Sequence, residues 1–110
     1  TLIKDGQYGG VYNISGWNEI SNKTIVEKIL GLMNKSNDLI EYVGDRPGHD
    51  RRYSIDSSKL QNEMGWKPKF DFDAALKTTV SWYLDNTEWW EPLADEKTLH
   101  PQPWTLDWDN

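Results

Sequence analysis

A short cationic loop holds the residues best suited to bind a ligand. Residues 45–53 read Asp-Arg-Pro-Gly-His-Asp-Arg-Arg-Tyr and contain three of the twelve Lys and Arg residues and one of the two His residues. Pro47 and Gly48 predict a tight bend, because proline fixes φ and glycine is favoured in turns. An arginine guanidinium can donate to two phosphate oxygens at once. The loop therefore indicates a phosphate site that contains Arg46 and His49.

The same loop can also be interpreted as a purely structural turn. Asp45, Asp50 and Asp56 are close to the arginines in sequence and could neutralise them in ion pairs. We expect this structural role for Arg51 and Arg52, which would point to opposite faces of an extended chain. Chemistry alone leaves both interpretations of the loop open.

The elements that would position this loop are a strand, a helix and a second strand. Residues 11–14 and 39–43 predict the two short strands. The segment between them has apolar residues spaced near 3.6, which predicts a helix with one buried face. These residues are Ile25, Val26, Ile29, Leu32 and Met33. The order predicts a parallel pair with a right-handed crossover, and ligands in open α/β folds bind at loops that follow strands.

The start of this helix has more than one possible cap. Ser21 or Asn22 could accept from the first backbone N–H groups, and Thr24 with Glu27 offers a capping box instead. The pattern does not select one of these alternatives.

Shorter elements follow the loop. Residues 53–55 predict a brief strand, and Tyr53 is expected in the core rather than in a sugar pocket. Asp56 or Ser57 then caps a helix with Leu60 and Met64 that ends at Gly65. Asp71 or Asp73 caps a third helix, whose apolar stripe is Leu76, Thr79, Val80, Tyr83 and Leu84.

Composition excludes several classes of protein. A net charge of −6 argues against a broad nucleic-acid surface, and no apolar run is long enough to span a membrane. Cysteine is absent, which excludes disulfides and thiolate metal sites and fits the cytoplasm. The first residue is Thr1 rather than methionine, so we expect part of a longer polypeptide.

Several stretches together resemble the dTDP-glucose 4,6-dehydratases, which are extended short-chain dehydrogenase/reductases. The loop and its continuation to Asp56 carry the most specific part of this resemblance. The other matching stretches, in order, are 10–14, 19–22, 59–60, 65–68 and 79–84. Related nucleotide-sugar epimerases and dehydratases carry variants of the loop.

The resemblance implies an α/β fold, namely the small mixed substrate-binding lobe of such an enzyme without its Rossmann domain. Residues 1–93 would form the lobe and residues 94–110 a tail rich in Trp and Pro. Arg46 matches the arginine that contacts the diphosphate, and His49 lies close to the nucleotide sugar. Asn22 matches an asparagine near the diphosphate at a helix start, although a plain cap explains it equally well.

The family binds NAD in the Rossmann domain and uses a Tyr with a Lys four residues later. No tyrosine here has that lysine, and the glycine fingerprint for NAD is absent, so we expect the isolated chain to be inactive. The resemblance implies a dTDP-sugar substrate and a parent homodimer. A UDP- or GDP-sugar epimerase or dehydratase and a free-standing binding module are the alternatives.

Tryptophan clusters in the last part of the chain. The chain has seven Trp residues, and Trp89, Trp90, Trp104 and Trp108 fall in this part. Such residues can stack on sugar rings, but clustered Trp more often buries apolar surface. We therefore expect packing, in the core or against another domain.

Overall fold

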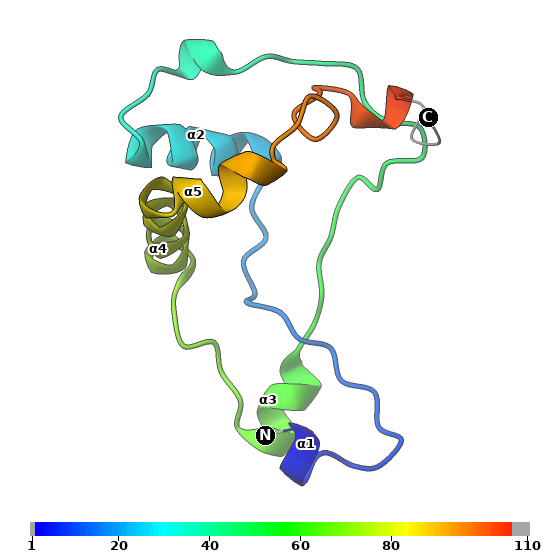
Figure 1. Ribbon diagram of the computed structural model, residues 1–110. Helices are drawn as coiled ribbons and strands as arrows, with labels where there is room; N and C mark the ends of the chain where they lie inside the picture. The colour runs from blue at the N-terminus through cyan, green and yellow to red at the C-terminus, as the bar shows by residue number, and fades with distance from the viewer. Residues whose placement is uncertain (1, 107–110) are drawn as a thin grey trace.

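Helices joined by long extended segments make up the protein in the computed structural model, which describes residues 2–106 (Figure 1). The α-helices are α1 (Leu2–Asp5), α2 (Asn22–Leu32), α3 (Ser58–Met64), α4 (Phe72–Asp85) and α5 (Thr87–Trp90). The 3-10 helices are η1 (Asn37–Leu39), η2 (Glu91–Leu93) and η3 (Pro103–Thr105). Figure 1 shows α2, α4 and α5 together at one end of the molecule and α1 and α3 at the other.

The two longest helices are α2 and α4, and each begins at a side-chain cap. The Ser21 hydroxyl accepts from the Thr24 N–H at 3.2 Å, so Asn22 is the first helical residue rather than the cap. Asp71 caps α4 by accepting from the Ala74 N–H at 2.9 Å. Such caps satisfy N–H groups that have no partner inside the helix. The two helices contact each other, and the Lys28 ammonium donates to Oδ1 of Asp73 at 2.7 Å.

The buried part of the molecule is centred on α3. Leu60 is 1% exposed and Ser57 is fully buried. The Ser15 hydroxyl donates to the Ile55 carbonyl at 2.7 Å and lies 3.2 Å from the Ser57 hydroxyl. Gly65 ends α3 with φ +61°, a left-handed conformation that favours glycine. This junction ties the segment that leads into α2 to the start of α3.

The expected strands at 11–14, 39–43 and 53–55 do not form anywhere in residues 2–106. Only Leu39 of these residues is helical, as the last residue of η1, and the rest of the three segments is irregular. A strand exists only when a neighbouring strand accepts and donates its backbone hydrogen bonds. Here Ser15 bridges two of these segments through its side chain, without a ladder. The strand part of the predicted α/β lobe is therefore wrong for the described chain, whereas its three principal helices are confirmed.

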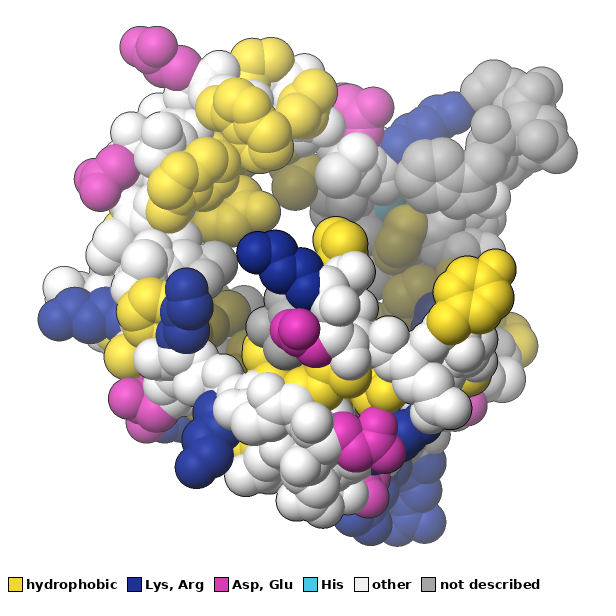
Figure 2. Space-filling view, turned by 90° about the horizontal axis from the view of Figure 1, so that it is seen from below, with side chains coloured by type: hydrophobic (Ala, Val, Ile, Leu, Met, Phe, Trp, Pro, Cys, Tyr) yellow, Lys and Arg dark blue, Asp and Glu magenta, His cyan; other side chains and the backbone are white. Residues whose placement is uncertain are grey.

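The molecule is open. Its radius of gyration is 18.1 Å and its surface is 9561 Å². A compact protein of this size has a radius of about 13 Å and a surface of roughly 6300 Å². Large apolar side chains such as Tyr8 (104% exposed) and Val11 (80%) stand in solvent. Figure 2 shows hydrophobic side chains gathered on the surface around a hollowed centre. The chain alone therefore encloses very little core.

Aromatic side chains pack where α4 meets α5. Trp89 lies edge-on to Trp82, with ring centroids 5.3 Å apart, and the Trp90 indole donates to the Tyr83 carbonyl at 2.8 Å. The expected burial of clustered tryptophan is confirmed only in part, because Trp90 is half-buried here whereas Trp89 is 62% exposed. Trp104 is 41% exposed, and Trp108 lies outside the described residues.

Candidate functional site

A hollow of about 870 Å³ lies between the start of α2 and the cationic loop. Residues 19–22 form one wall, and Asp45 with residues 49–53 forms the other. The first turn of a helix presents N–H groups without helical partners, and its dipole favours negative charge. The hollow therefore combines a helix amino terminus with three basic side chains. These are His49, Arg51 and Arg52.

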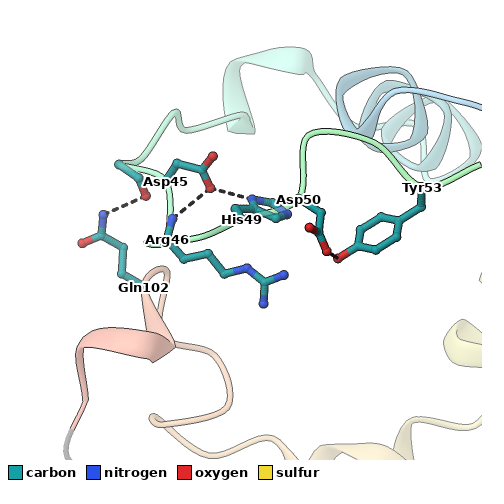
Figure 3. Close-up of polar contacts among 7 residues, drawn as sticks. Asp45, Arg46, His49, Asp50, Tyr53 and Gln102 are labelled. Carbon is teal, nitrogen blue, oxygen red and sulfur yellow. Dashed lines mark hydrogen bonds and ion pairs between the residues drawn. The ribbon is translucent and has the colours of Figure 1, made fainter.

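The bend of the loop is held by Asp45 (Figure 3). Its Oδ1 accepts from the Arg46 backbone N–H at 2.8 Å and from the His49 Nδ1 at 2.6 Å. The His49 bond is the largest cause that lowers the pKa of Asp45 below its ordinary value of 3.8. An ionised carboxylate can only accept, so Nδ1 of His49 carries a proton and its orientation is fixed. Gly48 closes the turn with φ +69°.

A bidentate ion pair joins the loop to the segment before α2. The Arg52 Nε lies 2.6 Å from Oε1 of Glu19, and its Nη2 donates to Oε2 at 2.7 Å. The Arg52 bond is the largest cause that lowers the pKa of Glu19 from its ordinary value of 4.5. The structural ion pair expected for Arg52 is therefore confirmed. Arg51 lines the hollow and makes no ion pair in the described part of the chain.

Tyr53 stands between two hollows rather than in the core, so its expected core position is wrong. It is 64% exposed, because this loop has no layer of chain packed over it. Its hydroxyl donates to Oδ2 of Asp50 at 2.8 Å, and this bond raises the pKa of Tyr53. A second hollow of about 480 Å³, lined by residues 15–19 and 53–56, adjoins the first. Trp17 lies on its wall with φ +54°, which is strained for a tryptophan.

The three residues expected to bind the nucleotide sugar occupy two positions. Asn22 and His49 line the larger hollow together. Arg46 comes from the same bend but does not line it, and Figure 3 shows its side chain reaching away from the Asp45 carboxylate. Sequence reasoning missed Glu19 as a wall residue. Its only signal was its place at the start of the 19–22 stretch that carries part of the family resemblance.

The tail also contacts Gly44, the residue just before the loop. The Gln102 amide donates to the Gly44 carbonyl at 3.3 Å (Figure 3). No cluster of three or more His, Cys, Asp or Glu side chains suited to a metal ion occurs within residues 2–106. In the same range, no helix has the length and apolar character needed to cross a bilayer.

Comparison with known proteins identifies relatives of this chain. The family model described as GDP-mannose 4,6 dehydratase matches residues 5–79. A probable dTDP-glucose 4,6-dehydratase of Sinorhizobium fredii is 43% identical over 102 residues, covering 86% of this chain and 29% of that protein. The dTDP-glucose 4,6-dehydratase of Escherichia coli is 44% identical over 98 residues, covering 83% of this chain and 27% of that protein.

Solved structures give the same result. The crystal structure of dTDP-glucose 4,6-dehydratase from Bacillus anthracis in complex with NAD superposes with a TM-score of 0.80 at 48% identity, covering 84% of this chain and 29% of that one. A double mutant of the Streptomyces venezuelae enzyme gives 0.81 at 36% identity, covering the same two shares, 84% and 29%. The chain thus spans less than a third of the length of these relatives. It belongs to the GDP-mannose 4,6 dehydratase family.

Proposed function

We propose that this chain is the nucleotide-sugar-binding part of a dTDP-glucose 4,6-dehydratase. That enzyme converts dTDP-glucose to dTDP-4-keto-6-deoxyglucose and water. The relatives at 43% to 48% identity described above carry this name. The observation that carries the proposal is the hollow that Asn22 and His49 share, because it places a helix amino terminus opposite a loop rich in arginine.

In this proposal the loop and α2 hold the diphosphate from two sides. Asn22 and the N–H groups of the first turn of α2 donate to phosphate oxygens. Arg46 lies on the same bend but outside the lining of the hollow, and it supplies a guanidinium to the diphosphate from there. His49 is oriented by Asp45 through Nδ1, so its Nε2 is directed away from that carboxylate toward the nucleotide sugar. These residues bind and orient the substrate and perform no bond breaking.

NAD does not fit the residues present in this chain. Binding of its pyrophosphate needs a glycine-rich turn between a strand and a helix. Gly9 and Gly10 are followed by irregular backbone from residue 11 to residue 21, with no helix until Asn22. We therefore assign NAD and the catalytic groups to a Rossmann domain elsewhere in the parent enzyme, and we expect the 110-residue chain alone to be inactive.

The chain divides, in this proposal, into the lobe 1–93 and the tail 94–110. The last turn of the lobe is η2, which ends at Leu93. The Gln102–Gly44 hydrogen bond places the tail beside the loop, where it can support the bend. The parent enzyme is proposed to act in the cytoplasm as a homodimer.

A GDP-sugar dehydratase is the second candidate, since the matching family model is described as GDP-mannose 4,6 dehydratase. The two candidates separate in a turnover assay of the full-length protein with NAD and dTDP-glucose, GDP-mannose or UDP-glucose. The 4-keto-6-deoxy product can be detected by mass spectrometry. Preferential conversion of dTDP-glucose supports the proposal, whereas turnover of GDP-mannose alone replaces it with the second candidate.

The role of Arg46 can be measured separately. A hydrogen bond between charged groups contributes about 1.5–3 kcal/mol. Arg46→Ala in the full-length protein should therefore weaken dTDP binding by that amount in calorimetry. The matched control is Lys35→Ala, which removes an exposed cation beyond the end of α2, away from the residues that line the hollow. Equal affinities of wild type and Arg46→Ala would remove Arg46 from the site.

A further inference from the structure

The consecutive arginines Arg51 and Arg52 both line the hollow but have different surroundings. Arg52 uses Nε and Nη2 to hold both carboxylate oxygens of Glu19, at 2.6 Å and 2.7 Å. Arg51 makes no hydrogen bond or ion pair within residues 2–106. One edge of the Arg52 guanidinium is therefore occupied, whereas the Arg51 guanidinium keeps all its donors for another group.

The carboxylates of the hollow do not compete for Arg51. Asp45 is bonded to His49 at 2.6 Å and Asp50 to the Tyr53 hydroxyl at 2.8 Å. Glu19 is occupied by Arg52. Each acidic side chain on the wall thus has its own partner, and Arg51 is the cation in the described lining that an anionic ligand can reach without breaking an ion pair.

The Glu19–Arg52 pair also fixes the geometry of the hollow. The two residues are 33 positions apart in sequence, and Glu19 lies two residues before the cap Ser21. A bidentate arginine–carboxylate pair restricts orientation as well as distance. The pair therefore holds the loop at a set separation from the first turn of α2, which is where the diphosphate is proposed to bind.

We propose that the two arginines have different roles. Arg51 binds a phosphate of the ligand directly, and Arg52 with Glu19 forms a positioning pair. This inference rests on the proposed function for the identity of the ligand. The Arg51 guanidinium donates to the anion, whereas Arg52 acts only by keeping the loop and α2 together.

The test is calorimetry of dTDP binding to the full-length protein at low and high salt. Arg51→Ala should weaken binding about 10- to 100-fold, the loss of one charged hydrogen bond, and should reduce the salt dependence of affinity. Arg51→Lys should recover part of the affinity, because the charge returns without the fork. Unchanged affinity and salt dependence in Arg51→Ala overturn the role of Arg51.

The positioning pair is tested by exchange of its charges. Arg52→Glu alone should weaken binding, and the double variant Glu19→Arg with Arg52→Glu should restore it to within about threefold, because the pair is rebuilt in reverse. Circular dichroism and the melting temperature check that each variant is folded. If the double variant melts like wild type but binds as weakly as Arg52→Glu, Arg52 touches the ligand and the proposed division is wrong.

A second probe separates this inference from the proposed function. Inorganic pyrophosphate carries the anionic part of the ligand without base or sugar. Suppose that the wild-type protein binds pyrophosphate but not dTDP, and that Arg51→Ala abolishes the pyrophosphate binding. This result supports the anion site and contradicts the dTDP-sugar assignment. Wild-type protein that binds neither probe contradicts both.

Discussion

Leu60→Ala probes the junction at the start of α3, next to the smaller hollow that Ser15 and Ile55 line. Leu60 is 1% exposed, and its helix α3 starts beside Ser57, whose hydroxyl lies 3.2 Å from that of Ser15. The substitution removes three carbons, and each buried carbon contributes about 0.8 kcal/mol. The transfer loss is therefore about 2.4 kcal/mol, and any unfilled cavity adds to it. Since about 1.4 kcal/mol corresponds to a factor of ten, local opening of α3 should become roughly 50-fold more frequent.

Native-state hydrogen exchange on the full-length protein measures this opening. The reporters are the amides of Gln61 and Gly65, which donate within the helix to the Ser57 and Gln61 carbonyls at 3.1 Å and 2.8 Å. The matched control is Leu84→Ala, measured on the amides of α4. Because Leu84 is 52% exposed, this substitution should accelerate exchange less than about tenfold. Exchange in α3 that stays within threefold of wild type would refute Leu60 as the centre of this core.

Two further predictions concern charge and backbone. Arg52→Ala should raise the pKa of Glu19 toward its ordinary value of 4.5, because the bond from Arg52 is the largest cause of its depression. A carboxyl whose pKa is lowered in the folded state stabilises the fold at pH values above its ordinary pKa. This contribution is lost as the pH falls through the folded-state pKa, so the loop should detach from Glu19 in acid. Carbon-detected NMR titration measures this pKa, and an unchanged value would contradict the contact. Gly65→Ala should destabilise the protein by about 1 kcal/mol at φ +61°, whereas Gly31→Ala, inside α2 with open space for a Cβ, should stabilise it by about 0.5–1 kcal/mol. Urea denaturation compares the two, and effects of the same sign would exclude this explanation.

The helices could be predicted from the sequence because their signals are local. The 3.6-residue spacing located α2 and α4, and Gly65 marked the end of α3. The choice between caps could not be made locally, since Ser21 and Asn22 are both good acceptors. Only the geometry selected Ser21, through its bond from the Thr24 N–H.

The strands and part of the site depended on contacts between distant segments. Residues 11–14 have the composition of a strand, but a strand also requires a hydrogen-bonded neighbour, and none is present in residues 2–106. The pairing of Glu19 with Arg52 crosses 33 residues and leaves no local pattern. The cationic bend itself could be recognised, because Pro47 and Gly48 are turn residues set among arginines.

A crystal structure of the full-length protein with dTDP tests most directly whether this hollow binds the diphosphate of a nucleotide sugar. We predict density for the diphosphate between the first turn of α2 and the loop, within hydrogen-bond distance of Asn22 and of the Arg51 guanidinium. A nucleotide bound elsewhere, with the Glu19–Arg52 pair intact and no phosphate beside it, would contradict the assignment.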